Sequence, residues 1–207
     1  MTRPRVAVLL SGSGSNMVAL IRAMQAGDVA ADPVVVLSSE PGAGGLSKAV
    51  DLGVPAVAVD WRKNRGDRAA HDAEVAAHLS DAGADLVVLA GYLRIMTTDF
   101  VETWRGRMLN IHPSILPLFK GLNTHARALE AGMAVHGCTV HEVVPELDSG
   151  HILGQAVVPV RAGDTPSTLA ARVLEQEHRL YPAALAAFVS DPGKARSQPI
   201  AMLVAAG

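Results

Sequence analysis

Three side chains suited to acid–base chemistry lie in two short polar segments of the sequence, MLNIHPSILP and VVPELDSG. Asn110 and His112 are two residues apart at the end of an apolar run, so on a β-strand they share one face. Pro113 ends that strand, and Asp148 follows a second apolar run. An amide can stabilise an oxyanion, an imidazole can move a proton, and a carboxylate can hold the imidazole charged or oriented. This set predicts attack on a carbonyl group.

The elements that must position these residues alternate in type along the first half of the chain. Strands are predicted at residues 6–10, 34–39, 55–60, 85–91 and 108–112. Helices are predicted between them, at 16–26, 46–52, 68–79 and 97–104. Such alternation indicates parallel βαβ units, in which ligands bind at the carboxyl ends of the strands. We therefore expect Asn110 and His112 at that edge.

The second half of the chain has a different order of predicted helices and strands. A short helix is predicted at 125–131, and two apolar runs, 135–144 and 151–160, follow without a helix between them, which indicates an antiparallel hairpin. A long amphipathic helix is expected at 165–188, with Pro182 kinking or ending its regular part. The sequence thus predicts an α/β fold, a Rossmann-like open twisted sheet that is mainly parallel with antiparallel strands at one side. We expect a single domain over residues 1–190 and a weakly specified tail, 191–207, with a short strand near 200–204.

Composition excludes several classes of protein. The chain is 49% hydrophobic and 3% aromatic, so its core must consist mainly of aliphatic side chains. The net charge is −2 and no run of Lys or Arg occurs, which disfavours a nucleic-acid partner. We also expect no membrane span and no signal peptide, because the apolar runs are too short. Cys138 is the only cysteine, which excludes an intrachain disulfide and fits a reducing cytoplasm.

The turn SGSGSN, between the first strand and the first helix, is a candidate anion site, since glycines let the backbone N–H groups approach a ligand. A tight turn without any ligand is one alternative, and a dinucleotide fingerprint is another. Gly12 and Gly14 fit the first two fingerprint positions, but Met17 stands where the third glycine belongs. Glu40 lies near the position of a ribose-binding acid, so the nicotinamide interpretation is weakened but stays open.

A zinc site is a further possibility, because His136, Cys138 and His141 lie close in sequence. On a regular strand His136 and Cys138 share one face and His141 takes the other, so one ion does not readily collect all three. The chain also has no repeated Cys/His pair spacing. We expect no metal, and we expect Cys138 to be a small buried side chain.

The motifs together resemble those of the glycinamide ribonucleotide formyltransferases. The similar segments are SGSGSN, AGYLRIM, NIHPSILP, LDSG and EQEHRLYP, which cover nearly the whole chain except its last residues. The resemblance implies the formyltransferase fold, with a nucleotide-binding N-terminal half and a folate-binding C-terminal half. It also implies formyl transfer from 10-formyltetrahydrofolate to the amine of glycinamide ribonucleotide, in purine biosynthesis and without a metal.

The resemblance further implies roles for individual residues. Asn110, His112 and Asp148 match the catalytic positions. The positions that contact the ribonucleotide are Gly14, Ser15, Asn16 and Glu177, although Glu177 alone is typical of a helix surface. The folate-binding positions are Arg68, Leu93, Arg94, Ile95, Met96, Asn110, Val144, Pro145, Glu146, Leu147 and Asp148. Lys120 and His151 stand where prolines are frequent, and both flank the catalytic strands.

Three other functions compete with this interpretation. A methionyl-tRNA formyltransferase shares similar motifs but has a C-terminal tRNA-binding domain, for which we expect no room in this chain. A formyltetrahydrofolate hydrolase usually has an additional N-terminal regulatory domain. A non-catalytic nucleotide-binding protein would use SGSGSN alone, and the intact Asn110, His112 and Asp148 disfavour it. The sequence leaves a monomer and a homodimer equally open.

Overall fold

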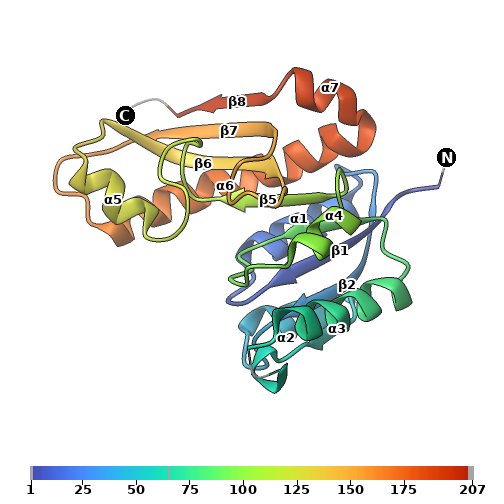
Figure 1. Ribbon diagram of the computed structural model, residues 1–207. Coiled ribbons are helices and arrows are strands. Elements are labelled where there is room, and N and C mark those ends of the chain that lie inside the picture. The colour runs from blue at the N-terminus through green and yellow to red at the C-terminus, as the bar shows by residue number, and fades with distance from the viewer. Residues whose placement is uncertain (1, 65, 205–207) are drawn as a thin grey trace. The chain divides into compact units, whose positions relative to one another are not determined.

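A computed structural model describes residues 2–64 and 66–204. The chain divides into two compact units, Met1–Asn110 (unit 1) and Ile111–Gly207 (unit 2), and each is described by itself. The strands of the described residues belong to one sheet with the order β3-β2-β1-β4-β5-β6-β7-β8 (Figure 1). This mainly parallel α/β sheet confirms the predicted fold class.

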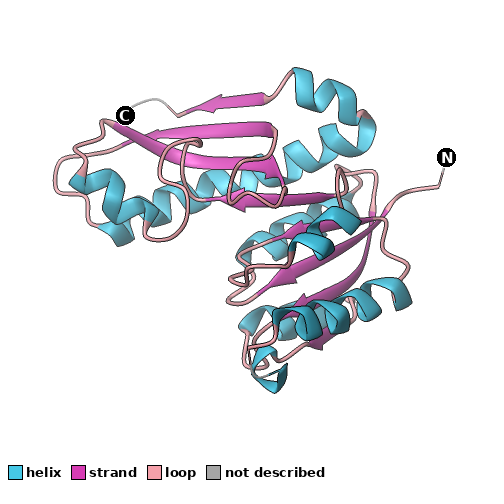
Figure 2. Cartoon of the chain, in the orientation of Figure 1, coloured by secondary structure: helices cyan, strands magenta, loops and turns pink. Residues whose placement is uncertain are grey.

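Unit 1 consists of parallel strands joined by helices (Figure 2). Its strands are β1 (Arg5–Leu10), β2 (Asp32–Ser38), β3 (Ala56–Ala58), β4 (Leu86–Leu89) and the start of β5 (Met108–His112). Its helices are α1 (Ser15–Ala26), α2 (Gly44–Asp51), the 3-10 turn η1 (Trp61–Asn64), α3 (Arg68–Asp81) and α4 (Thr98–Thr103). Five consecutive residues of β1 and all four of β4 are buried, as expected for strands covered on both faces.

The parallel register brings the ends of neighbouring strands together. Leu10 at the end of β1 pairs with Ser38 at the end of β2, and Leu9 pairs with Leu89 at the end of β4. Leu89 in turn pairs with Asn110 on β5. The Gly-rich turn after β1 and the AGYLRIM segment after β4 therefore start from the same edge of the sheet, as the sequence predicts.

Unit 2 contains the predicted hairpin, formed by the antiparallel strands β6 (Val135–Glu142) and β7 (Ile152–Pro159). Strand β8 (Ile200–Leu203) pairs in parallel with β7, which confirms a short strand in the tail. Helix α6 (Pro166–Ser190) packs along β6 and β7, and α5 (Thr124–Glu130) and α7 (Pro192–Ser197) complete the unit (Figure 1). Thr165 and Thr168 form a capping box at the start of α6, and Pro166 follows the cap.

Two features of unit 2 differ from the sequence prediction. Pro182 was predicted to kink or end the regular part of the long helix. It does not end the helix, because α6 continues to Ser190, and a kink at Pro182 stays a prediction. A buried face that includes Leu180, Tyr181, Leu185 and Phe188 holds the helix, and this packing outweighs a proline cost of about 3 kcal/mol. Helix α7 was not predicted. Residues 205–207 of the tail lie outside the described residues, and the single-domain organisation stays a prediction.

An ion pair ties the tail to the hairpin. Arg196 on α7 donates from Nε and Nη2 to the carboxylate of Glu142 on β6, at 2.9 and 2.7 Å. The Glu142 side chain is almost fully buried, so the paired guanidinium compensates its lost hydration. Helix α7 is therefore attached to the hairpin of unit 2 by a buried ion pair.

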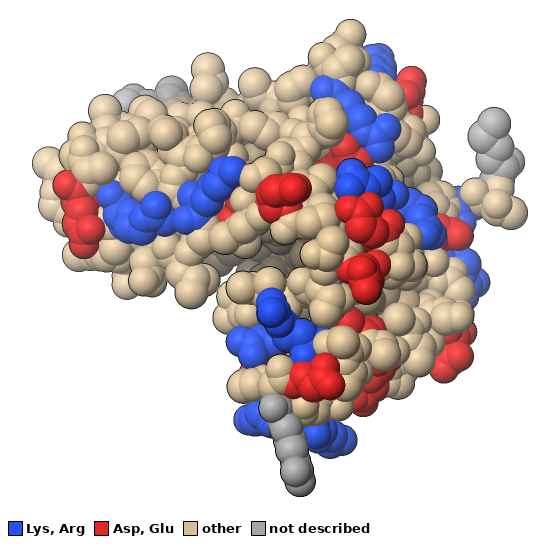
Figure 3. Space-filling view, viewed as in Figure 1, with Lys and Arg blue, Asp and Glu red and all other residues tan. Residues whose placement is uncertain are grey.

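Two further observations concern the helices and the surface charge of the described residues. None of their helices combines the length and the apolar character that a bilayer span requires. On the face shown in Figure 3, acidic side chains lie among the basic ones.

Candidate active site

The Gly-rich turn of unit 1 is built on backbone contacts that only glycine permits. Gly14 is the N-cap of α1 and has φ 74°, a left-handed conformation. A Cβ atom there would lie 2.7 Å from the Cα of Gly45, at the start of α2. The N–H of Gly45 donates to the carbonyl of Gly12 at 3.1 Å, so the two loops hold each other. This packing leaves the amino end of α1, at Ser15 and Asn16, directly after the turn.

A pocket of about 490 Å³ opens beside this turn. It is lined by Ser11, Gly12, Ser13, Glu40, Gly42, Ala43, Gly44 and Arg62. The carboxylate of Glu40, the candidate ribose-binding acid, accepts a hydrogen bond from Trp61 Nε1 at 2.6 Å and lies 3.6 Å from Arg62 Nη2. That carboxylate is therefore already engaged by two donors within unit 1.

The segment after β4, residues 92–97, has no regular secondary structure. The side chains of Leu93 and Ile95 are 64% and 67% exposed, so neither belongs to the core. Arg94 is not a free solvated charge, because its guanidinium stacks 4.3 Å from the ring centroid of Trp61. Arg68, which is also exposed, is the first residue of α3.

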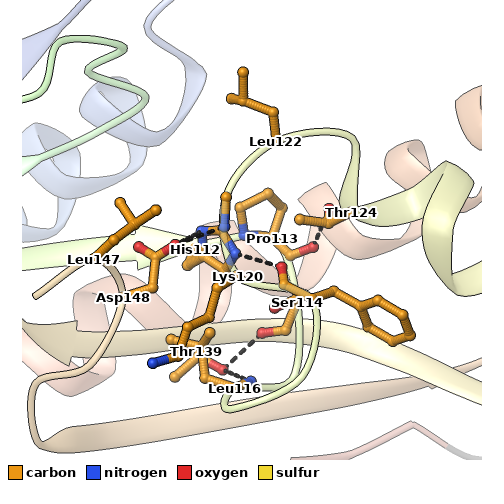
Figure 4. A network of polar contacts seen from close by, with 12 residues as sticks. His112, Pro113, Ser114, Leu116, Lys120, Leu122, Thr124, Thr139, Leu147 and Asp148 are labelled. Atoms are coloured by element: carbon orange, nitrogen blue, oxygen red, sulfur yellow. Dashed lines mark hydrogen bonds and ion pairs between the residues drawn. The ribbon is translucent and has the colours of Figure 1, made fainter.

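His112 lies at the carboxyl end of β5, two residues after Asn110 on the same strand. Figure 4 shows its ring beside the carboxylate of Asp148. The Nε2 atom of His112 is 3.1 Å from the carbonyl oxygen of Phe119, and its Nδ1 atom is 3.5 Å from Asp148 Oδ2. Both neighbours are hydrogen-bond acceptors, so a ring with protons on both nitrogens satisfies both of them. The predicted imidazole–carboxylate pair is thus formed within unit 2.

Asp148 adopts a left-handed conformation, with φ 48°, in the turn between β6 and β7. Asp tolerates this conformation better than most residues. The Oδ2 atom accepts a hydrogen bond from the backbone N–H of Gly121 at 2.9 Å, and the side chain is only 8% exposed. Val144 and Pro145 in the same loop are half-buried, whereas Glu146 and Leu147 are exposed. The turn thus buries one carboxylate and presents an apolar side chain beside it.

Sequence reasoning missed His141, which it considered only as a zinc ligand. Its Nε2 atom lies 3.7 Å from Asp148 Oδ1, and its Nδ1 atom lies 2.8 Å from the carbonyl of Glu142. Burial lowers the pKa of His141, so this second imidazole is mainly neutral near pH 7. The register of β6 shifts between Val140 and His141, which interrupts the side-chain alternation used to place His141.

The residues that replace frequent prolines make contacts of their own. Lys120 donates from Nζ to the hydroxyl of Ser149, which joins the loop after β5 to the turn that carries Asp148. His151 is exposed, and its Nδ1 atom lies 3.6 Å from Glu142 Oε2. Phe119, just before Lys120, has φ 55°, an unusual value for a bulky residue. The Lys120 contact bridges the two loops that position His112 and Asp148.

Glu177 on α6 differs from the expectation for a helix-surface acid, because it is buried. Its negative charge and the burial of Cys138 both raise the pKa of that thiol, with burial the larger cause. His136 is also buried, and its ring lies edge-on to the ring of His125 with centroids 5.1 Å apart. Burial lowers the pKa of His136 to about 4. Among the described residues, no three His, Cys, Asp or Glu side chains are grouped so that they could hold a metal ion.

An open α/β sheet with an imidazole–carboxylate pair at the end of a strand is an arrangement suited to an enzyme that uses acid–base chemistry. The formyl transferase family model matches residues 4–185 of this chain. The chain therefore belongs to the formyl transferase family.

Individual relatives agree with this assignment. The chain is 43% identical to the phosphoribosylglycinamide formyltransferase of Haemophilus influenzae, over 86% of this chain and 84% of that protein. It is 48% identical to the trifunctional purine biosynthetic protein adenosine-3 of Gallus gallus over 87% of this chain, but it spans only 18% of that protein. The crystal structure of the Brucella melitensis phosphoribosylglycinamide formyltransferase is 51% identical, with a TM-score of 0.85 over 91% of this chain and 96% of that one.

The glycine turn yields a prediction about stability. Gly14→Ala should lower the free energy of unfolding of unit 1 by about 1–3 kcal/mol, because the methyl group meets the Gly45 backbone and φ is positive. Gly12→Ala is the matched control, since a Cβ there meets no atom within 4 Å. Urea unfolding followed by tryptophan fluorescence measures this, because Trp61 and Trp104 both lie in unit 1. Equal losses for the two variants would contradict the packing argument.

Proposed function

We propose that this chain transfers the formyl group of 10-formyltetrahydrofolate to the amine of N1-(5-phospho-D-ribosyl)glycinamide, giving the N2-formyl product and tetrahydrofolate in de novo purine (IMP) biosynthesis. Membership in the formyl transferase family supports the reaction type. The observation that carries the proposal is the buried pair of His112 and Asp148, which is built from the two motifs that carry the resemblance. The proposed catalytic residues are Asn110, His112 and Asp148.

The ribonucleotide is proposed to bind through Gly14, Ser15, Asn16 and Glu177. The left-handed conformation of Gly14, the N-cap of α1, supports this, because the backbone N–H groups that start the helix follow directly after it. The backbone N–H groups and the helix dipole there favour a phosphate group. Glu177 offers a carboxylate to the cationic or hydrogen-bonding part of the glycinamide.

The chain also has side chains that fit a folate. Leu93 and Ile95 in unit 1 and Leu147 in unit 2 are apolar and exposed, so each offers an apolar surface to a folate ring. A bound 10-formyltetrahydrofolate would supply the formyl carbon that the amine attacks. The residues proposed to hold it are Arg68, Leu93, Arg94, Ile95, Met96, Asn110, Val144, Pro145, Glu146, Leu147 and Asp148.

His112 and its neighbours have distinct proposed tasks. The side-chain amide of Asn110 donates a hydrogen bond to the negative charge that develops on the formyl oxygen. His112 donates a proton to the departing nitrogen, directly or through one water. Asp148 Oδ2 faces Nδ1 of that ring at 3.5 Å, so it orients the imidazole. The neutral His141 beside Asp148 adds no competing positive charge.

The wider proposal concerns partners and location. We propose small-molecule substrates, no resident metal, no nucleic-acid or membrane partner, and a monomer or homodimer in the cytoplasm. The net charge of −2 and the single buried thiol support this setting. A formyltetrahydrofolate hydrolase and an enzyme like methionyl-tRNA formyltransferase are the alternatives.

One assay tests the proposed reaction. Purified protein should convert 10-formyltetrahydrofolate to tetrahydrofolate only when the ribonucleotide is present, because the proposed acceptor of the formyl group is the amine of the ribonucleotide and not water. Absorbance of the folate product and mass spectrometry of the ribonucleotide measure both products. Equal turnover without the ribonucleotide would instead identify a hydrolase, and formylation of methionyl-tRNA would identify the other alternative.

The carboxylate of Asp148 is expected to be essential for turnover. Asp148→Asn should fold normally, because Asn also accepts the left-handed conformation and can still accept the hydrogen bond of Gly121. Its kcat should fall on the order of a hundredfold, since the negative charge facing His112 is lost. Glu130→Gln, an exposed acid in the same unit, is the control. Wild-type turnover by Asp148→Asn would remove Asp148 from the mechanism.

Transfer is expected to be direct, without a formylated enzyme. Cys138 is the only thiol, it is fully buried, and burial raises its pKa, so it is a poor nucleophile. Cys138→Ala should therefore keep kcat within about twofold, because the amine attacks the formyl group directly and no thiol carrier is needed. Mass spectrometry of the protein with the donor alone should show no added formyl group. A chemically competent adduct at Cys138 would overturn direct transfer.

A further inference from the structure

Residues 92–97 form an unusual exposed segment in unit 1. They have no helix or strand structure, and two of their apolar side chains, those of Leu93 and Ile95, face solvent. A segment of this kind would sample many conformations if it were attached only through the chain. Its actual attachments therefore decide whether its backbone is preorganised.

The first end of the segment is held by α3. The hydroxyl group of Tyr92 lies 2.8 Å from Nε2 of His71, whose side chain belongs to the buried face of α3. Burial lowers the pKa of His71 and raises that of Tyr92, so both groups are neutral near pH 7. Among the described residues, Nδ1 of His71 has no hydrogen-bond partner, so the Tyr92 contact is the polar anchor of that ring.

The other end is held by the next residue of the same helix. Oδ2 of Asp72 accepts hydrogen bonds from both the backbone N–H and the hydroxyl group of Thr97, each at 2.7 Å. The Thr97 hydroxyl in turn accepts from the N–H of Phe100 at the start of α4. Asp72 is buried, and hydrogen bonds to an ionised acceptor are stronger than those between neutral groups.

The middle of the segment has two further attachments. The backbone N–H of Leu93 donates to the hydroxyl oxygen of Ser11 at 2.9 Å. The guanidinium of Arg94 stacks on Trp61. These four attachments hold the backbone of the segment in place, while the side chains of Leu93 and Ile95 remain exposed to solvent.

We propose that His71 and Asp72 are positioning residues, which hold the two ends of segment 92–97 so that it presents one preformed surface to the folate. This proposal rests on the proposed function, in which Leu93–Met96 bind the folate. His71 and Asp72 do not themselves touch the substrate. They reduce the conformational entropy that the segment loses when the folate binds, because a preorganised surface is already ordered.

Three variants test the proposal. Tyr92→Phe removes the hydroxyl that meets His71, Thr97→Val removes one donor to Asp72, and His71→Leu removes the imidazole. The matched control is His78→Asn, a histidine on the same helix outside these contacts. Hydrogen exchange of the ligand-free protein should be faster in residues 93–97 of the three variants than in the wild type and the control.

Kinetics and binding give the second readout. The KM for 10-formyltetrahydrofolate should rise on the order of tenfold in Tyr92→Phe, with the KM for the ribonucleotide and kcat nearly unchanged. Calorimetry with tetrahydrofolate should show the same loss of affinity. The double variant His71→Leu/Tyr92→Phe should lose no more than the worse single variant, because both changes remove one contact.

The outcomes distinguish the positioning role of His71 and Asp72 from the proposed function. Unchanged exchange in residues 93–97 of all three variants would overturn the proposal, and so would faster exchange with unaltered folate affinity. A lower melting temperature with unchanged kinetic constants would make these contacts merely structural, which also overturns it. Failure of the wild-type protein to transfer formyl groups would reject the proposed function. Normal wild-type transfer with unaltered folate affinity in the variants would reject only the positioning role of His71 and Asp72.

Discussion

Parallel pairing of β1, β2, β4 and β5 is the constraint on which the placement of the other groups depends. Strands that are buried on both faces offer no room for polar side chains along their length, so functional groups must lie where the strands end. The register of Leu10 with Ser38 and of Leu89 with Asn110 brings those ends to one edge. On the proposed function, Asn110 and His112 can reach a substrate because β5 stops at that edge.

The carboxylate of Asp148 shows how unit 2 manages a buried charge. One oxygen receives the backbone N–H of Gly121, and the two oxygens face the imidazoles of His112 and His141. A buried carboxylate costs several kcal/mol unless such partners replace its hydration. The same partners make the site asymmetric, because burial keeps His141 mainly neutral while His112 has acceptors at both nitrogens. The two imidazoles beside one carboxylate thus have different surroundings.

The sequence predicts much of this arrangement, and the exceptions have physical causes. Apolar runs such as that of β1 and the position of β5 follow from periodicity alone, because burial on both faces leaves a strong signal. The fate of Pro182 does not, since packing of α6 against β6 and β7 outweighs local propensity. Glu177 resembles a surface acid because helix periodicity cannot show which polar residue a neighbouring strand covers. The position of His141 beside Asp148 could not be predicted, because a shift in strand register leaves no mark in the sequence.

In both units, contacts from helices or strands hold loops that lack regular secondary structure. A loop that must face a ligand gives up the backbone hydrogen bonds of a helix or strand, and several of its residues adopt left-handed conformations. Gly14 and Gly91 do so in unit 1 without steric cost, whereas Phe119 and Asp148 do so in unit 2 with side chains that the surroundings must hold. In each case a side chain or backbone group from a rigid element supplies the missing bonds: Asp72 of α3 for the segment after β4, and His112 of β5 for the carbonyl of Phe119. The positions of side chains on such loops therefore depend on the contacts that helices and strands make with the loop. On the proposed function, residues such as Asp72 then contribute without touching a substrate.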